Sequence, residues 1–484
     1  MRRRTLLTAA AGIAASPALG GLARPAIAQS AARVLRFSPA VALTSIDPLW
    51  SLATISYTHG YMVWDTLFAI DSNLNPHPQA ADKAEVSDDQ LTWTITLRDG
   101  LIFHDNEPVR ARDAAASVKR WMQKDPIGQT IFAITNEVKT LDDKHFAIVL
   151  KQPFPTMRFS LASRNIFVQP ERLANTPASE QFKEVIGSGP YRFIASDFQP
   201  GAISHYARWD KYVARSEPPD LWSGGHVANF DRVEWTAQPD KSIEAAALQR
   251  GEIDWAEQPL LDLVPMLSKT KGLKVEAVDP FGGLAILRFN HLIPPFNNVA
   301  MRQALLAAID QKAVVEAVVG DQPQFGRVPV GFFTSGAPMA NDAGLSVLTG
   351  PRNADETKQR LAAAGYKGER IVMVAPSDIP AIMTMSQVMQ DQLHKMGLNI
   401  DFQVMDWGTM ISRIAKKDPI DQGGWNLYCV TWAGLTVSNP GSSYPLRANG
   451  LQANTGWPTD PKLEALRNDW LATSDLDKQK AIAQ

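Results

Sequence analysis

The sequence contains a single cysteine, Cys429, so an internal disulfide and a metal site built from several thiolates are both excluded. After an apolar stretch near its start, it also lacks any apolar run approaching the ~20 residues of a membrane-spanning helix. The chain also has no excess of positive charge, because its formal net charge is -2. We therefore expect neither nucleic acid nor an anionic membrane surface as a partner.

The first 28 residues have the three parts of an export signal. Three arginines at 2–4 precede an Ala-rich apolar stretch, and residues 26–28 read A-I-A, a pattern typical of a cleavage site. We predict a signal peptide at 1–28, cleavage after Ala28 and export to the periplasm. The run R-R-T-L-L at 3–7 favours the twin-arginine route, with an ordinary secretory signal as the alternative.

The remaining chain has the composition of a globular protein. The signal carries four arginines and no acid, so its removal takes the net charge from -2 to -6. With 20% charged and 45% hydrophobic residues, the whole chain is ordinary in composition. Its length is sufficient for two or three domains with a large core.

Residues 93–113, W-T-I-T-L-R-D-G-L-I-F-H-D-N-E-P-V-R-A-R-D, are the most informative stretch. Apolar and polar residues alternate from Trp93 to Arg98, which predicts a half-buried strand. Asp99 and Gly100 predict a turn. We expect a second short strand at 101–103 and a helix at 109–121.

This stretch resembles the signature of the extracellular solute-binding proteins of family 5, which serve peptide and nickel importers of the ABC type. Asn106 stands where that signature has Gly, and Ala114 where it has Val. Three further blocks follow in the family's order: G-S-G-P-Y at 187–191, G-E-I-D at 251–254, and the F-N, P-P-F-N and R-Q-A-L run at 289–305. Taken singly, G-E-I-D or R-Q-A-L is a weak indication of the family, but four blocks in the family's order are a strong one.

Other segments predict the remaining elements. In the first half we expect strands at 34–37, 146–150 and 191–195, and helices at 57–70 and 242–250. In the second half we expect a helix at 299–319 ended by Gly320, and a helix capped by Asn353 with Glu356 three residues on. A strand at 370–374, a helix at 381–396 and a strand at 398–404 predict a βαβ unit with parallel strands.

The resemblance implies an α/β, two-lobed periplasmic-binding-protein fold of a type II-like kind that closes on its ligand. We expect lobe one at 29–282 with an inserted subdomain at about 75–185, and lobe two at 283–470. Residues 471–484 would begin a C-terminal return towards lobe one, which we expect to be truncated. Gly282 and Gly283 are candidates for a hinge, with a plain tight turn as the alternative.

Leu435 is the departure with the clearest consequence. In peptide-binding members, a Trp-containing segment of lobe two ends in an Asp that pairs with the peptide's ammonium group. The matching segment here is 425–435, and aligning it on Trp432 places Leu435 at that Asp. Loss of one partner of a buried ion pair costs ~3–5 kcal/mol, or about 10² to 10³-fold in affinity. The hypothesis is a ligand without a free ammonium at this place.

The remaining candidate residues combine aromatic walls with a few polar groups, as binding pockets do. Aromatic residues at strand spacing are also common in cores, so a core role is the alternative for each. Arg447 is a candidate for an anionic group, since guanidinium binds carboxylate bidentately. The full set of predicted ligand-binding residues is Thr44, Ser45, Trp407, Trp425, Tyr428, Trp432, Gly434, Leu435 and Arg447.

The sequence gives only weak indications of a catalytic site. Residues 268–271 fit S-x-x-K, but the motifs that accompany it in hydrolases are missing, as are G-x-S-x-G and the P-loop. His104 and Asp105 lie inside the family signature, where they are a fold element. We expect no enzyme activity, cofactor or resident metal. Capture of a nickel chelate by histidines of both lobes stays open as an alternative.

The predicted function is the periplasmic substrate-binding component of an ABC importer. It would capture a small solute, peptide-like or of another organic kind, and deliver it to permease subunits in the inner membrane. The family's habit implies a monomer. A receptor that presents its ligand to a membrane sensor, and a periplasmic hydrolase on the same scaffold, are the alternatives.

Overall fold

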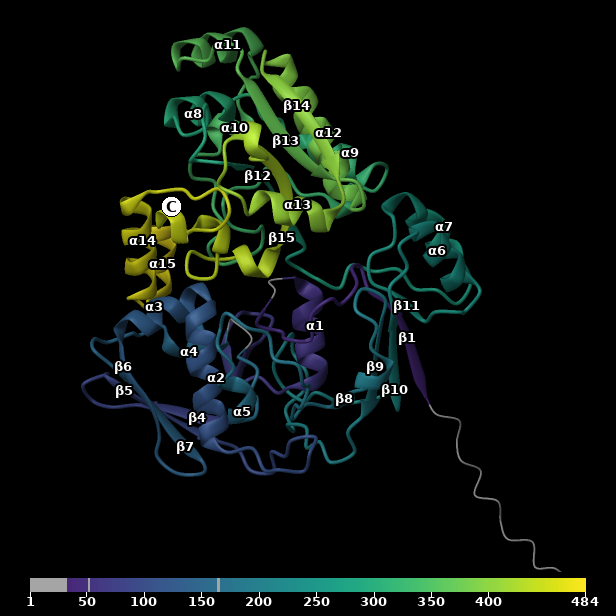
Figure 1. Cartoon of the computed structure of the whole chain (residues 1–484), viewed down its shortest axis with the longest axis vertical. Helices are drawn as coiled ribbons and strands as arrows, with labels where there is room; N and C mark the ends of the chain where they lie inside the picture. The colour runs from purple at the N-terminus through teal and green to yellow at the C-terminus, as the bar shows by residue number, and fades with distance from the viewer. Residues whose placement is uncertain (1–32, 51–52, 163–165) are drawn as a thin grey trace, which may run out of the picture.

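The computed structural model describes residues 33–50, 53–162 and 166–484, whose strands form four sheets (Figure 1). Strands up to residue 256 build three sheets in one half of the molecule, and strands from residue 283 build the fourth in the other half. The predicted α/β class is therefore confirmed. The predicted signal peptide, its twin-arginine pattern and its cleavage site lie outside the described residues.

The first sheet has the order β11-β1-β10-β9-β8. Strand β1 is parallel to β10 and β11, whereas β9 is antiparallel to β10 and β8. The strands are β1 Val34–Ser38, β8 Tyr191–Phe193, β9 Ile203–Arg208, β10 Arg232–Thr236 and β11 Trp255–Ala256. The strands predicted at 34–37 and 191–195 are present, although the second ends early, where Ala195–Asp197 forms a 3-10 turn.

The second sheet is antiparallel, with the order β4-β5-β7-β6, and a short hairpin of β2 and β3 lies in the same half. Trp93, Ile95 and Leu97 of β5 are buried, as the alternation predicted. The strands are β2 Phe68–Ile70, β3 Pro76–Pro78, β4 Ala81–Val86, β5 Thr92–Leu97, β6 Thr135–Thr140 and β7 His145–Leu150. The helices of this half are α1 Thr54–Val63, α2 Ala111–Lys124, α3 Pro126–Ile134, α4 Met157–Ala162, α5 Glu171–Ala174, α6 Lys241–Gln249 and α7 Val264–Lys269.

The short strand predicted at 101–103 is wrong. Only Ile102 forms a bridge, with Pro108, and proline has no N–H with which to extend a ladder. The chain turns instead, and Asn106 has φ 72°, in the left-handed region that favours glycine and that asparagine tolerates. Asn106 therefore preserves the turn that the family signature makes with Gly.

The helix predicted at 57–70 is also wrong in its second part. Helix α1 ends at Val63, Trp64 is extended, and 68–70 is strand β2. The Trp64 indole donates a hydrogen bond to the carbonyl of Ile186 at 2.8 Å. A Cβ on Gly187 would lie 1.9 Å from the Val63 carbonyl oxygen, so the G-S-G-P-Y turn packs directly against the helix end. Contacts distant in sequence end this helix.

The sheet of the other half has the order β12-β15-β13-β14. Strands β13 and β14 are parallel and joined by α12, so the predicted βαβ unit is confirmed. Strand β13 is buried from Ile371 to Pro376. The strands are β12 Gly283–Phe289, β13 Arg370–Pro376, β14 Asn399–Met405 and β15 Leu427–Ala433.

The single helix predicted at 299–319 is two helices. The Asp310 carboxylate accepts a hydrogen bond from the Ala313 N–H at 3.1 Å and so starts a second helix. Gly320 ends it, and Asn353 caps the later helix by accepting from the Glu356 N–H, both as predicted. The helices of this half are α8 Val299–Leu306, α9 Gln311–Val319, α10 Ser346–Thr349, α11 Ala354–Ala363, α12 Pro380–Lys395 and α13 Trp407–Ile414.

The last two helices, α14 Pro461–Leu471 and α15 Leu476–Ala483, lie near α3 (Figure 1). Trp470 and Leu471 are buried in the same apolar cluster as residues of β5, α2 and α4. The Thr156 hydroxyl donates to the carbonyl of Leu471 at 2.6 Å. The end of the chain is thus attached to the half that contains the first strands. Across the described ranges, no helix is both long and apolar enough to cross a membrane.

Candidate ligand-binding site

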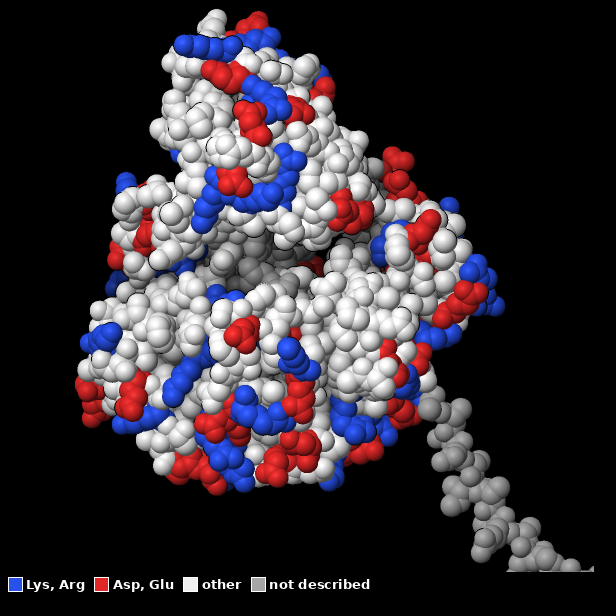
Figure 2. All heavy atoms as spheres, in the orientation of Figure 1, with Lys and Arg blue, Asp and Glu red and all other residues white. Residues whose placement is uncertain are grey.

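The surface is hollowed between the two halves on the face that Figure 2 shows. Charged side chains gather over the outer surfaces of this face, and few line the walls of the hollow. A concave region with mostly uncharged walls is where small ligands usually bind.

The chain crosses between the halves beside the end of β15. Gly283 of β12 pairs with Ala433, and the Gly434 N–H donates to the carbonyl of Gly282 at 2.7 Å. A Cβ on Gly434 would lie 2.3 Å from the Phe281 carbonyl oxygen, so only glycine fits this close approach. The proposed hinge and the Trp432 segment, far apart in sequence, therefore lie side by side.

Trp432 stands next to this crossover and keeps part of its side chain exposed. Its ring lies 6.0 Å from that of Tyr444, with an angle of 38° between the planes. Sequence reasoning missed Tyr444, because the polar loop between the two residues shows no periodicity that predicts the contact. The two rings form an aromatic surface at the junction of the halves.

Leu435 packs across the junction. It contacts the apolar cluster of the first half and lines a narrow gap with Ile70, Leu74 and Phe159 of that half. The polar residues that share this gap, Ser438, Asn439 and Ser442, are all uncharged. The gap therefore offers a ligand no carboxylate from the residues that line it.

Trp425 and Tyr428 belong to the core of the second half. Trp425 is fully buried, and its indole donates to the carbonyl of Ile414 at 2.9 Å. Its ring lies 5.0 Å from that of Tyr428, which is also buried. Trp407 is half-buried against the same core. The structure does not bring these three residues together with Trp432. Trp425 and Tyr428 have the core role that was the alternative to ligand binding.

Thr44 and Ser45 lie in the loop after β1. Thr44 is exposed, whereas the Ser45 hydroxyl is buried and donates to the Gln181 side chain at 2.7 Å. Asp47 anchors the loop through a bidentate ion pair with Arg120, with distances of 2.7 and 3.1 Å. Ser45 is thus engaged within its own half, and Thr44 is the residue of the pair that stays exposed.

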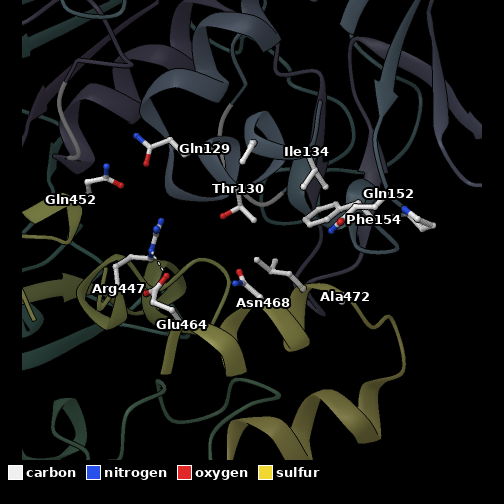
Figure 3. A pocket seen from close by; sticks show the side chains of 13 residues that line it. Gln129, Thr130, Ile134, Gln152, Phe154, Arg447, Gln452, Glu464, Asn468 and Ala472 are labelled. Carbon is white, nitrogen blue, oxygen red and sulfur yellow. Dashed lines mark ion pairs between the residues drawn. The ribbon is translucent and has the colours of Figure 1, made fainter. Parts of the chain in front are cut away.

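Arg447 does not line the surface formed by Trp432 and Tyr444. Its Nε lies 3.3 Å from a Glu464 oxygen, and its Nη1 donates to the carbonyl of Pro126 at 3.4 Å. It lines a separate recess of about 440 Å³ beside α3 and α14 (Figure 3). An anionic group at Arg447 would therefore bind in that recess.

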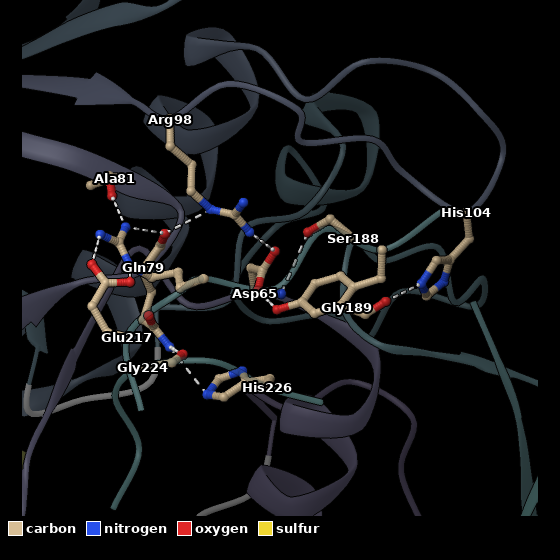
Figure 4. A network of polar contacts seen from close by, with 12 residues as sticks. Asp65, Gln79, Ala81, Arg98, His104, Ser188, Gly189, Glu217, Gly224 and His226 are labelled. Carbon is tan, nitrogen blue, oxygen red and sulfur yellow. Dashed lines mark hydrogen bonds and ion pairs between the residues drawn. The ribbon is translucent and has the colours of Figure 1, made fainter. Parts of the chain in front are cut away.

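His104 belongs to a polar network inside the first half (Figure 4). Its Nε2 donates to the carbonyl of Gly189 at 3.0 Å, and its Nδ1 accepts from the Gly187 N–H at 3.4 Å. Burial chiefly lowers the pKa of His104 to about 4, so the imidazole is neutral near pH 7. Both ring nitrogens hold the G-S-G-P-Y turn, which is a fold role.

Asp65 is a buried acid of the same network that sequence reasoning missed. Its carboxylate accepts from the Tyr212 hydroxyl at 2.9 Å and lies 3.6 Å from Arg98. Burial raises its pKa, opposed by the positive charge of Arg98. These contacts join distant loops of one half. In the described part of the chain, no group of three or more His, Cys, Asp or Glu side chains could hold a metal ion.

Comparisons with known proteins identify the relatives of this chain. The family model of the bacterial extracellular solute-binding proteins, family 5 Middle, matches residues 75–454. The probable peptide ABC transporter periplasmic-binding protein y4tO of Sinorhizobium fredii is 38% identical over 480 residues, covering 98% of this chain and 90% of that protein.

Solved structures share the fold at low identity. The periplasmic binding protein DppA of Helicobacter pylori, in complex with the peptide STSA, matches with a TM-score of 0.75 and 20% identity. AgaA of A. tumefaciens R10, in complex with agropinic acid, matches with the same two values. Each match covers 93% of this chain and 88% of the other. The predicted two-domain fold is confirmed, and the chain belongs to the bacterial extracellular solute-binding proteins of family 5, the substrate-binding components of ABC importers.

Proposed function

We propose that this protein closes its two lobes on a small organic solute beside Trp432 and delivers it to the permease. The observation that carries the proposal is the Trp432–Tyr444 aromatic surface next to the Gly434–Gly282 crossover. Closure about this point would bring the first half over the two rings. Aromatic faces at the junction of two halves suit an organic ligand.

The proposed solute has no free α-ammonium at the position of Leu435. Leu435 packs on apolar side chains, and the polar groups beside it are neutral. A buried ammonium without a carboxylate partner is strongly disfavoured. The matched structures hold a peptide in one case and agropinic acid in the other, so the fold alone leaves the ligand open.

Restoring the acid tests this assignment. We expect Leu435→Asp to raise the affinity for a tripeptide with a free ammonium by about 10² to 10³-fold, measured by titration calorimetry. Leu435→Asn has nearly the same shape without the charge and should not show this gain. Equal peptide affinity of the wild type and Leu435→Asp would contradict the assignment.

The division into lobes and the export route belong to the same proposal. We assign lobe one to 29–282, with its subdomain at about 75–185, and lobe two to 283–470, followed by a return at 471–484. The start of β12 at Gly283 and the positive φ of Gly282 support the first crossover. A signal cleaved after Ala28 would place a monomeric protein in the periplasm. The mass of the exported protein tests this, because its first residue should be Gln29.

A further inference from the structure

The recess that Arg447 lines is separate in its residues from the Trp432 surface. One wall is a face of α3, the opposite wall is a face of α14, and Arg447 and Gln452 close one end (Figure 3). Its volume of about 440 Å³ lies within the usual range of small-molecule sites. None of its lining residues comes from β15 or from the Gly434–Val437 turn.

Positive charge is in surplus at the end of this recess. Arg447 and Arg467 lie 3.3 and 3.2 Å from the same Glu464 oxygen, so two guanidinium groups share one carboxylate. The other Glu464 oxygen accepts from the Ala448 N–H at 2.7 Å. Burial, and then the charge of Arg447, lower the pKa of Arg467 to about 10, which leaves it protonated near pH 7.

Of the two arginines, Arg447 is the one that has an N–H donor available for a ligand. Arg467, a residue of α14, is buried and donates to the carbonyls of Pro440 and Gly441. Arg447 faces the recess (Figure 3). Its Nε lies within ion-pair distance of Glu464 and its Nη1 donates to the carbonyl of Pro126, but no described residue accepts a hydrogen bond from its Nη2. A charged donor without an acceptor gains strongly from an anionic partner that reaches it.

The other walls supply uncharged polar groups over an apolar floor. The side chains of Gln152, Gln452 and Asn468 line the recess and make no hydrogen bond to another residue that the structure describes. Phe154 and Leu471 are buried beneath them. Amide side chains both donate and accept, so they match the amide or hydroxyl groups of a polar solute.

We infer that this recess is a second small-molecule site, which binds a carboxylate-bearing solute of about dipeptide size. The carboxylate meets Arg447 and balances the surplus charge, and amide or hydroxyl groups of the solute meet the amide side chains. Since α14 follows the sheet of the second half and α3 belongs to the first, an occupant contacts both parts of the chain.

A matched pair of probes tests the inference. The full chain carrying Trp432→Ala, which removes the aromatic wall of the other site, is titrated with N-acetyl-L-alanyl-L-alanine and with its C-terminal amide. We expect the acid to bind at least ~10-fold more tightly than the amide. Adding Arg447→Met should abolish that preference.

A blocking variant keeps the test decisive if Arg447→Met folds poorly. Ala133 is an exposed residue of the α3 wall, so Ala133→Trp should fill the recess and abolish binding of the acid. Phe132→Trp changes the neighbouring exposed residue, which does not line the recess, and should bind as the parent does. Equal binding of acid and amide, no binding of the acid, or undiminished binding by Ala133→Trp would each overturn the inference.

Discussion

Gly434 shows how a single residue sets the junction of the two halves. An added Cβ would lie 2.3 Å from the Phe281 carbonyl oxygen and 2.8 Å from a Thr334 methyl carbon. We expect Gly434→Ala to lower the free energy of unfolding by about 1–3 kcal/mol, as overpacking does. Gly283→Ala is the control, because its nearest neighbour would be 3.8 Å away. Equal stability of the two variants in denaturant would contradict this account.

His59 predicts how stability depends on pH. Burial chiefly lowers its pKa to about 3. The neutral ring donates from Nε2 to the carbonyl of Ile46 at 3.2 Å and accepts at Nδ1 from the Tyr206 hydroxyl at 2.9 Å. The unfolded chain takes up this proton first, near pH ~6.5. The stabilisation is therefore complete above that pH and is lost as the pH falls towards 3, at up to about 1.4 kcal/mol per unit.

The measurement is the unfolding free energy of wild type and His59→Gln between pH 7 and pH 4. The variant lacks the titrating ring, so its stability should fall less steeply over this window than that of the wild type. His394→Gln alters an exposed histidine of α12 and should follow the wild-type slope. Parallel slopes for wild type and His59→Gln would rule out this role for His59.

The Asp47–Arg120 ion pair anchors the loop that follows β1. The two side chains are 0% and 3% exposed. We expect Asp47→Asn to cost about 3–5 kcal/mol of stability, because it leaves a buried guanidinium without its charge partner. Asp355→Asn in the exposed pair with Lys358 should cost about 1 kcal/mol or less. Chemical denaturation of both variants measures the difference, and similar losses would count against the role given to burial.

Single residues of the candidate site could be predicted only in part. The family resemblance predicts Trp432 and Leu435 at the cleft, and in the structure both lie beside the crossover between the halves. The burial of Trp425 depends on α13, and the ion pair of Arg447 depends on Glu464 in α14. Such contacts arise between segments distant in sequence, and no local pattern encodes them.

At the scale of elements, the break between α8 and α9 has a local cause. Asp310 caps α9, so Asp310→Ala should destabilise the protein by about 1 kcal/mol. Asp391→Ala, within α12, removes a surface ion pair with the exposed Lys395 and should change stability by less. Thermal unfolding of both variants checks the order. A larger loss for Asp391→Ala would contradict the capping role.

Elements with a strong local signal were predicted correctly. Strand β5 follows from its alternation, and the β13–α12–β14 unit from two strands around a long amphipathic helix. The failures have tertiary causes. Helix α1 stops at Val63 because the 187–189 turn packs against its end, and residues 101–103 form no strand because their partner is Pro108. Apolar periodicity alone predicts neither the packing of this turn nor the proline partner.

At the scale of the molecule, two halves meet at a glycine-lined crossover beside an aromatic surface, and α14 and α15 attach to the first half. A ligand that binds both halves stabilises the closed form by RT ln(1 + [L]/Kd), about 2.7 kcal/mol at one hundred times Kd. The protein should therefore unfold at a higher temperature when its solute is present, and Trp432→Ala should lose most of that shift.

The most direct measurement identifies the solute itself. The exported protein is purified without denaturant, unfolded, and the molecules it releases are identified by mass spectrometry beside those released by Trp432→Ala. The account predicts that the wild type releases a small organic solute without a free α-ammonium, and that the variant releases far less of it. Release of ordinary peptides with a free amino terminus, in equal amounts from both proteins, would contradict it.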